Sequence, residues 1–320
     1  MLLGVDIGGT KCALVSAEND GKIRKKVVFA TSDVKTTLNR ICSDTRKLAE
    51  ENSIEAVGIS CGGPLDAQKG EILSPPNLPG WDKVPITALL TEATGAPAFL
   101  CNDANACALA EWKYGAGIGC NNMIFLTFGT GMGAGLILNG RLYEGANGLA
   151  GEAGHMRITE DGPLGYGKNG SFEGYCSGGG IANLGKAIAA NAIKNGSPLW
   201  WCKDYDAIDK ITSKTVAEAA LNGDESAQKI YEISAKKLGL GLSILIDLFN
   251  PERIIIGSVF TRAEKLFRKT MEEVISEEAL PEAAGVCKIL PAALGDAIGD
   301  FAAVAVAQRG LDAKIKEKNK

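Results

Sequence analysis

The chain has 320 residues, of which 46% are hydrophobic and 22% are charged, and its formal net charge at pH 7 is −4. This length is enough for two domains with a large buried core, and the weakly acidic balance gives no electrostatic basis for nucleic acid or a membrane as the main partner. No apolar run is long enough for a transmembrane helix, and a strand pattern begins at the first residues, so we expect no targeting segment and a cytoplasmic location.

The first half of the chain predicts a mixture of strands and helices. We expect strands at residues 2–7, 11–16, 23–30, 56–60 and 98–101. Apolar spacing favours helices over 37–51 and 104–114, and Gly115 ends the second of them. Pro75 to Trp81 is expected to be an ordered loop, because its prolines exclude a helix or a central strand. The glycine-rich residues 115–119 are the expected domain boundary.

The second half begins with another strand, turn and strand over residues 124–138. A glycine-rich loop over 145–180 and a helix over 226–249 follow. The inward face of that helix is expected to be Ile230, Ile233, Leu242, Leu245 and Leu248. A buried strand at 253–256 and an alanine-rich last helix around 301–308 complete the pattern. The nine cysteines contain no C-x-x-C pair and predict buried free thiols in a reducing compartment.

Two glycine-rich turns lie between apolar strands. The first is Gly8-Gly9-Thr10-Lys11 and the second is Gly129-Thr130-Gly131-Met132-Gly133. Bare backbone N–H groups, hydroxyls and a lysine ammonium are the groups that phosphate oxygens bind. The pair therefore predicts that both turns hold the phosphates of one nucleotide. Asp6, at the end of the first strand, is expected to hold Mg²⁺ or its water shell.

Two short patterns suggest other functions. Gly129-x-Gly131-x-x-Ala134 fits a dinucleotide fingerprint, but that motif requires a helix after its glycines, and a strand is expected here. Gly58 to Gly62 fits the nucleophile elbow of hydrolases, with Ser60, Asp103 and His155 in hydrolase order. The elbow also requires a helix directly after it, which Gly63-Pro64 disfavours.

Asn102 and Asp103 stand where a strand gives way to a helix. One interpretation is that Asp103 is the N-cap of that helix, a position that aspartate fills well. The other is that the helix dipole keeps Asp103 ionised, so that its carboxylate accepts and orients a hydroxyl proton as the base of a kinase. The residue pattern leaves both interpretations open.

The segment Gly151-Glu152-Ala153-Gly154-His155 contains the only histidine of the chain, and Glu173 follows it. Short polar groups between glycines on an exposed loop are suited to hydrogen bonding with a polyhydroxylated ligand. The alternative is that His155 is buried in the core with its hydrogen bonds satisfied.

Seven motifs occur in an order and spacing typical of one known family. They are Asp6 to Lys11, Gly62-Gly63-Pro64, Pro76 to Trp81, Asn102 to Asn105, Gly129 to Gly135, Gly151 to His155 and Asn250-Pro251. On these matches, which cover nearly the whole length, the chain resembles the ROK family of sugar kinases and sugar-responsive repressors. The resemblance implies an α/β, two-lobed, actin-like ATPase (ribonuclease H-like) fold with a central cleft. The lobes would comprise residues 1–117, completed by a C-terminal helix at 301–320, and residues 118–300.

The resemblance also implies an activity, which is the phosphorylation of a hexose or N-acetylhexosamine by ATP and Mg²⁺ at the 6-hydroxyl, with Asp103 as the base. The residues that would contact the sugar are Asn77, Asn102, Glu152, His155 and Glu173. Those that would contact the nucleotide are Asp6, Gly8, Gly9, Thr10, Lys11, Thr130, Gly131 and Gly257. A homodimer is also expected. The competing function is a sugar-sensing binding protein that kept the fold and lost turnover.

The chain departs from the family where many members carry a zinc motif, C-x-C-G-x-x-G-C-x-E. Leu164, Tyr166 and Ser171 stand at the thiolate positions, and none of them suits a tetrahedral structural zinc site. We therefore expect a zinc-free member in which His155 has only a sugar-binding role. Family repressors carry an N-terminal helix-turn-helix domain, for which the four residues before Val5 leave no room, so we expect no DNA binding.

Overall fold

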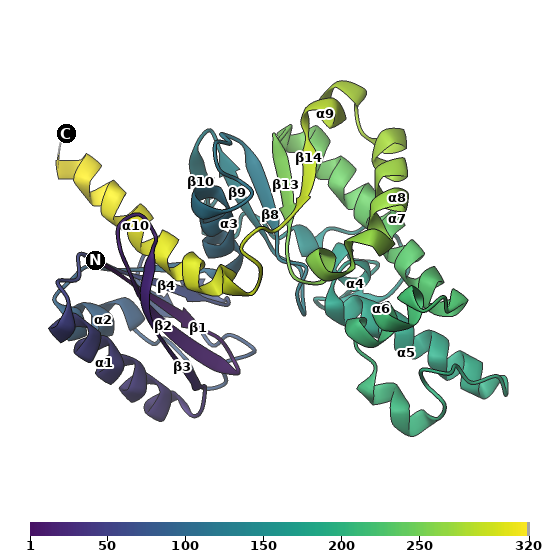
Figure 1. The fold of residues 1–320 in the computed structure, drawn as a ribbon, viewed down its shortest axis with the longest axis horizontal. Coiled ribbons are helices and arrows are strands. Elements are labelled where there is room, and N and C mark those ends of the chain that lie inside the picture. Colours follow the sequence, from purple (N-terminus) through teal and green to yellow (C-terminus); the bar gives the residue numbers. More distant parts are fainter. Residues whose placement is uncertain (319–320) are drawn as a thin grey trace. The chain divides into compact units, whose positions relative to one another are not determined.

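The computed structural model describes residues 1–318, and this part of the chain divides into two compact units (Figure 1). Unit 1 contains Met1–Gly119, Leu142–Gly148 and the chain from Ala293 onward, and unit 2 contains Cys120–Arg141 and Leu149–Ala292. The lobe boundaries expected from the sequence stay a prediction, and residues 319 and 320 of the expected first lobe lie outside the described part.

Unit 1 is built on a five-stranded sheet with the strand order β3-β2-β1-β4-β7. Its strands are β1 (Leu2–Ile7), β2 (Lys11–Ala17), β3 (Ile23–Ala30), β4 (Ala56–Cys61) and β7 (Ala98–Asn102). A small hairpin pairs β5 (Leu65–Asp66) with β6 (Glu71–Ile72). The main helices are α1 (Val34–Glu51), α2 (Ile86–Thr94), α3 (Asp103–Tyr114) and α10 (Ile298–Lys318), and η3 (Gly295–Ala297) precedes the last. All five expected strands are therefore confirmed, each ending within one residue of its predicted bounds.

The strand directions of unit 1 determine where polar side chains gather. Strand β1 is antiparallel to β2, as predicted for the first hairpin, whereas β1, β4 and β7 are mutually parallel. The carboxyl ends of the three parallel strands therefore meet at one edge of the sheet. That edge is where the sequence places Asp6, Ser60 and Asn102.

Helix α10 lies unusually close to this sheet because small residues line the contact. A Cβ on Gly58 would lie 2.1 Å from the carbonyl oxygen of Ala303, and one on Gly4 would lie 3.0 Å from the Ala303 Cβ. Leu2, Val304 and Ala307 form a buried cluster on this side of the sheet. The alanine-rich last helix predicted around 301–308 is confirmed, and it is longer than predicted.

Unit 2 contains a second five-stranded sheet, with the order β10-β9-β8-β13-β14. Its strands are β8 (Met123–Leu126), β9 (Ala134–Leu138), β13 (Arg253–Ile256) and β14 (Lys288–Pro291), together with β10 (Arg141–Tyr143), of which Leu142 and Tyr143 are grouped with unit 1. Its helices are η1 (Ala153–His155), α4 (Phe172–Tyr175), α5 (Gly178–Lys194), η2 (Tyr205–Lys210), α6 (Ser213–Leu221), α7 (Glu225–Phe249), α8 (Val259–Glu278) and α9 (Pro281–Val286). Strands β8 and β9 are antiparallel, as predicted for the second hairpin.

Three predictions made from the sequence need correction. Residues 145–180 are not one loop, because they contain η1, α4, the start of α5 and a hairpin of β11 (Leu164–Gly165) and β12 (Lys168–Asn169). Leu248 was expected to point inward on α7, but its side chain is 70% exposed. The nine cysteines are all free, but Cys107 and two others are only partly buried. No helix in the described part of the chain is long and apolar enough to cross a membrane.

Candidate active site

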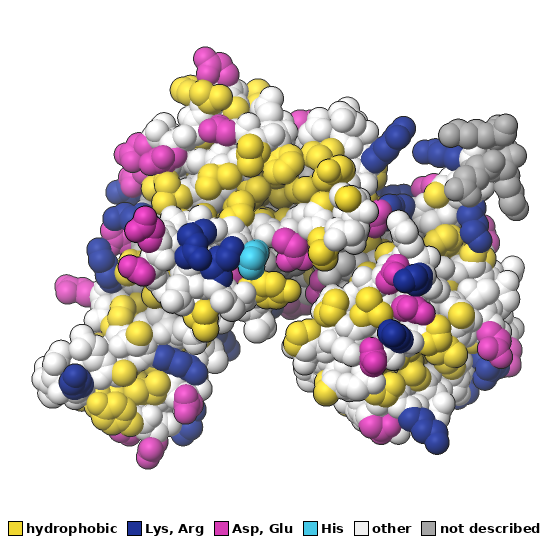
Figure 2. All heavy atoms as spheres, turned by 180° about the vertical axis from the view of Figure 1, so that it is seen from behind, with side chains coloured by type: hydrophobic (Ala, Val, Ile, Leu, Met, Phe, Trp, Pro, Cys, Tyr) yellow, Lys and Arg dark blue, Asp and Glu magenta, His cyan; other side chains and the backbone are white. Residues whose placement is uncertain are grey.

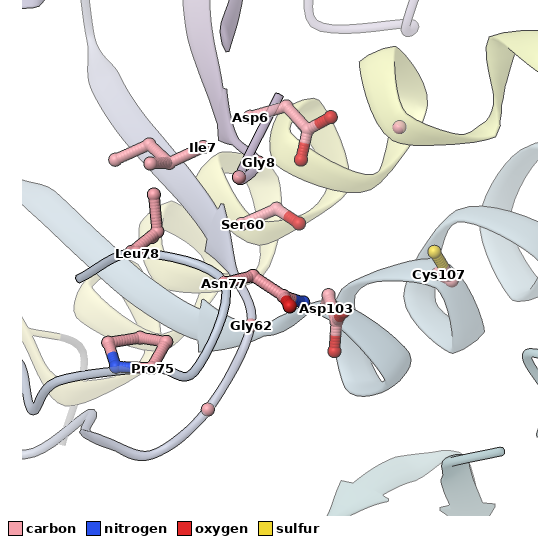
Figure 3. Close-up of a pocket in the computed structure, with 13 residues that line it drawn as sticks. Asp6, Ile7, Gly8, Ser60, Gly62, Pro75, Asn77, Leu78, Asp103 and Cys107 are labelled. Carbon is pink, nitrogen blue, oxygen red and sulfur yellow. The ribbon is translucent and has the colours of Figure 1, made fainter. Parts of the chain in front are cut away.

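A cavity of about 290 Å³ opens in unit 1 at the edge where the parallel strands end (Figure 3). Polar side chains from four segments line it, namely Asp6, Ser60, Asn77 and Asp103. Glycines from the β1–β2 turn and the loop after β4 also line it, together with Gly299 of α10. The cavity therefore combines carboxylates with stretches of bare backbone, as a site for a phosphorylated or hydroxylated ligand requires.

Asp6 lies opposite Ser60 in the register of β1 and β4, and its carboxylate accepts a hydrogen bond from the Ser60 hydroxyl. Desolvation by the surrounding protein raises the pKa of Asp6 from 3.8 to about 6, against the lowering effects of Ser60 and Lys11. The negative charges of Asp103 and Asp300 contribute to this raised pKa. Asp6 is therefore mostly ionised at pH 7, but its carboxylate is less stable than that of an exposed aspartate, and a bound cation would stabilise it.

This raised pKa predicts a pH-dependent stability effect for Asp6→Asn in the absence of metal and nucleotide. A carboxyl group that holds its proton more tightly when folded destabilises the fold as the pH rises from about 4 through about 6. The Asn variant should therefore unfold at the same urea concentration as wild type near pH 4 and be more stable above pH 6, by on the order of 1–3 kcal/mol. A difference that is equal at both pH values would contradict this origin of the shift.

Asn102, not Asp103, is the N-cap of α3. The Asn102 side chain accepts the backbone N–H of Ala104 at 3.0 Å, and the Asp103 Oδ1 accepts the same N–H at 2.8 Å from the first turn of the helix. The Asp103 side chain is open to the cavity, and neighbouring protein groups partly desolvate it. This desolvation raises the pKa of its carboxyl group, although the N–H groups of Ala104 and Asp103 oppose the shift. Asp103 is thus free of the capping position and faces the cavity.

The first glycine-rich turn packs against the loop that carries Asn77. The Gly8 N–H donates to the Lys11 carbonyl at 3.1 Å and closes the turn. A Cβ on Gly9 would lie 2.4 Å from the carbonyl oxygen of Asn77, so only glycine fits there without displacing the Asn77 loop. The Asn77 side chain extends toward Asp103 (Figure 3). The turn, Asn77 and Asp103 therefore form one continuous wall of the cavity.

The second glycine-rich turn belongs to unit 2 and is held by backbone and side-chain contacts. The Met132 N–H donates to the Glu173 Oε2 at 2.9 Å, and the Gly133 N–H donates to the Thr127 hydroxyl at 2.9 Å. A Cβ on Gly131 would lie 2.6 Å from the same Glu173 oxygen. The sequence did not predict that Glu173 contacts this turn. If Glu173 also binds a sugar, its carboxylate must contact both the turn and the sugar.

The two alternative motif interpretations are wrong. Strand β9 follows the second glycine-rich turn where a dinucleotide fingerprint needs a helix. Ser60 is a buried residue inside β4, and the next helix along the chain is α2, which begins at Ile86. The nucleophile elbow, which needs a helix directly after its serine, is therefore absent from this segment.

Of the remaining predicted residues, His155 and Glu152 are exposed, so the alternative that His155 is buried is wrong. Gly257 is buried between β13 and α8, and its N–H donates to the Leu126 carbonyl at 2.9 Å. Thr10, Lys11 and Thr130 are exposed at the two turns.

Comparison with known proteins identifies the family. The model of the ROK family matches residues 2–309. The chain belongs to the ROK family. It is 31% identical over 309 residues to a glucokinase of Thermotoga maritima, covering 95% of this chain and 96% of that one. It is 30% identical over 227 residues to a xylose repressor of Caldicellulosiruptor bescii, covering 71% of this chain and 55% of that one.

A crystal structure of a ROK family glucokinase from Streptomyces griseus, in complex with glucose and AMPPNP, superposes with a TM-score of 0.77 at 32% identity. The alignment covers 97% of this chain and 99% of the other. The predicted actin-like ATPase fold, with its mixed α/β sheets, is confirmed by this likeness.

The ROK zinc motif does not fit the residues of this chain. Leu164 and Tyr166 are 59% and 68% exposed, and the buried Ser171 hydroxyl already accepts from the Gly174 N–H and donates to the Gly165 carbonyl. Cys176 is buried, with its Sγ 3.4 Å from the Ser234 carbonyl. Within residues 1–318, no group of three or more His, Cys, Asp or Glu side chains is placed to hold a metal ion.

We therefore expect purified protein to contain no stoichiometric zinc, because a hydroxyl, a phenol and an alkyl group do not replace three thiolates. Elemental analysis after chelator treatment should find less than about 0.1 zinc per chain. The same protein should show full activity once magnesium is added. About one tightly held zinc per chain, whose removal lowers the melting temperature, would overturn this expectation.

Sequence reasoning placed neither Gly299 nor Cys107 at this cavity, and it considered Ser60 only for the hydrolase motif. A Cβ on Gly299 would lie 2.7 Å from the Asp6 Oδ2, so a larger residue in the first turn of α10 would have to displace the Asp6 carboxylate. Cys107 lies one turn after Asp103 on α3 and also lines the cavity. No local motif marks either residue, because each reaches the site through the packing of a helix.

Proposed function

We propose that this ROK protein transfers the γ-phosphate of ATP to a hydroxyl of a hexose or N-acetylhexosamine, with Asp103 as the base. The observation that carries the proposal is the unit 1 cavity, in which Asp103 and the first glycine-rich turn lie together. A base needs to accept the hydroxyl proton while the phosphate is held in place. The raised pKa of Asp103 brings its basicity nearer to neutral pH than that of an ordinary aspartate.

Asp6 would hold Mg²⁺ together with water and phosphate oxygens, since one or two carboxylates are the usual protein share of a magnesium site. Its carboxyl group faces the cavity and is mostly ionised at pH 7, and the Ser60 hydroxyl orients it. When bound, Mg²⁺ supplies positive charge that offsets the charge of the phosphates. Gly8, Gly9, Thr10 and Lys11 would bind phosphate oxygens from the first turn.

The second turn, with Thr130 and Gly131, and Gly257 would contact the nucleotide. The sugar would contact Asn77 and Asn102 of unit 1 and Glu152, His155 and Glu173 of unit 2. The 6-hydroxyl is the acceptor that the family resemblance implies. Support for these assignments comes from the position of Asn77 beside Asp103 and from the exposure of Glu152 and His155.

The second candidate is a sugar-sensing protein without turnover, which the similarity to a xylose repressor favours. A protein of that kind has no need of a base or a magnesium carboxylate. Asp6 and Asp103 both line the cavity here, which favours the kinase.

The proposal is tested by incubating the protein with Mg-ATP and a panel of glucose, mannose, fructose, allose, N-acetylglucosamine and N-acetylmannosamine. ADP release that depends on one or a few of these sugars supports the kinase. Phosphorus–proton correlation NMR of the product then shows which hydroxyl carries the phosphate. Phosphate on the anomeric hydroxyl or on another hydroxyl would overturn the 6-hydroxyl assignment but would still support the kinase activity.

His155→Ala is expected to raise the KM for the sugar by roughly 10- to 100-fold and to leave the KM for ATP nearly unchanged, because a buried sugar hydroxyl would lose its partner. Because His155 is exposed in the free protein, its loss should not change the melting temperature. Steady-state kinetics with each substrate varied in turn measure the two constants. Equal increases in both, with a lower melting temperature, would show that His155 supports the fold of unit 2.

A further inference from the structure

His155 is held at the surface of unit 2 by the β11–β12 hairpin. The Lys168 Nζ donates to the His155 carbonyl oxygen at 2.8 Å and lies 3.3 Å from the Nδ1 of the His155 ring. The ring of Tyr166 meets the His155 ring edge-on, with centroids 5.6 Å apart and planes at 87°. Figure 2 shows the sole histidine, in cyan, exposed next to basic side chains. The ring therefore has a fixed neighbour on one nitrogen and an open side.

The hairpin that carries Lys168 is itself tied to the segment after His155. The Arg157 guanidinium donates to the Asn169 carbonyl at 2.8 Å, and the Ile158 N–H donates to the Gly170 carbonyl at 2.8 Å. Ser171 closes the far end through its bond to the Gly165 carbonyl at 3.0 Å. Lys168 is also only partly exposed. The backbone that carries Lys168 is therefore held on both sides of this residue, and this limits the positions that its ammonium group can take.

The chemistry of this contact determines which ring nitrogen carries the proton. An ammonium group has three donors and no acceptor, so a nitrogen beside it must accept. In a neutral imidazole the other nitrogen then carries the proton and acts as a donor. We infer that Lys168 is a positioning residue that fixes His155 in the tautomer protonated at Nε2. The tautomer itself does not depend on the proposed function. Only its consequence, that His155 donates to the sugar, rests on that function.

The consequence concerns which sugar group can lie at His155. An Nε2–H group recognises an acceptor, which a sugar supplies as a hydroxyl oxygen or as the carbonyl oxygen of an N-acetyl group. A deoxy sugar that lacks the acceptor at that position leaves the donor unpaired and should bind less tightly.

The chain contains one histidine, so its ring nitrogens can be observed without assignment. Protein labelled with ¹⁵N-histidine is examined by long-range proton–nitrogen NMR, without sugar or nucleotide, at a pH where the ring holds a single proton. We expect the wild-type ring to be protonated at Nε2. In Lys168→Glu the carboxylate accepts, so the proton should move toward Nδ1, and in Lys168→Met the two tautomers should mix. Lys269→Met, which removes an 88% exposed lysine from α8, is the matched control and should leave the spectrum unchanged.

The kinetic arm uses the same variants. Lys168→Met should raise the sugar KM by roughly 3- to 30-fold with kcat and the ATP KM near wild type, and it should have no further effect in a His155→Ala background. A wild-type ring protonated at Nδ1, or a Lys168→Glu ring identical to wild type, overturns the inference. An Nε2–H ring in a protein that phosphorylates no sugar would leave the inference standing and refute the proposed kinase. If Lys168→Glu does not fold, the wild-type and Lys168→Met spectra still decide.

Discussion

Replacing Asp103 by Asn is expected to lower kcat by about 10²–10⁴-fold, the usual contribution of a positioned base. The carboxylate faces the unit 1 cavity beside Asn77, and the amide of the variant has nearly the same shape but cannot accept the hydroxyl proton. Sugar affinity should therefore change little. The wild-type kcat/KM should fall as the pH drops through the raised pKa of Asp103, and it should do so at a higher pH than an ordinary aspartate would give.

The capping geometry makes this prediction sharper. Because Asn102 caps α3, the Asp103→Asn variant should not melt at a lower temperature than wild type, since the helix loses no cap and the desolvated carboxyl group is replaced by a neutral amide. Stopped assays with saturating sugar and Mg-ATP measure kcat, and titration calorimetry measures sugar binding. Turnover close to wild type, together with a clearly lower melting temperature, would show that Asp103 acts on the helix and not on the sugar.

The largest effect on stability is expected for Glu111→Ala. The Glu111 side chain is fully buried at the end of α3. Its carboxyl oxygens accept the N–H groups of Ala116 at 2.8 Å, Ala293 at 3.2 Å and Leu294 at 2.9 Å. Ala116 lies just before the chain leaves unit 1, and Ala293 lies just after it returns. One side chain thus ties the end of the first segment of unit 1 and the start of its last segment to the same helix.

Removing this carboxyl group leaves three backbone donors without their partner and opens a cavity, which should cost about 3–5 kcal/mol in the free energy of unfolding. Urea unfolding followed by circular dichroism measures the loss. Glu111→Gln keeps one oxygen acceptor and should lose less, and Glu218→Ala on the exposed side of α6 should change stability by less than about 0.5 kcal/mol. A loss below about 1 kcal/mol for Glu111→Ala would show that water replaces the carboxylate at no great cost.

The parts of the fold that depend on local sequence were predictable. Both glycine-rich hairpins, and the strands that carry Asp6 and Asn102 near their ends, follow from apolar runs interrupted by glycine or polar residues. Each of these sequence signals spans only a few residues. The loop from Pro75 to Trp81 was predictable for the same reason, because proline excludes the alternatives locally.

The parts that depend on distant packing were not. Gly299 approaches Asp6 through the position of α10, nearly the whole chain length away, and its own sequence neighbourhood reads only as an alanine-rich helix. Glu173 contacts the second turn because α4 lies against it, although a family motif suggested a sugar contact alone. Asn102 and Asp103 are both good N-cap residues, and a shift of one residue in the start of α3 decides which of them is the cap. In the structure the helix begins at Asp103, so Asn102 is the cap.

The most direct test of the central claim is a coupled assay of ADP release with Mg-ATP, run with and without each sugar, for the wild type and for Asp103→Asn. The account predicts that a hexose or N-acetylhexosamine stimulates ADP release by wild type, with one phosphorylated sugar formed per ADP. The Asp103→Asn variant should bind the same sugar and release ADP at least about 100-fold more slowly. If a sugar binds to wild type by calorimetry but no member of the panel releases ADP, the protein is a sugar sensor and not a kinase.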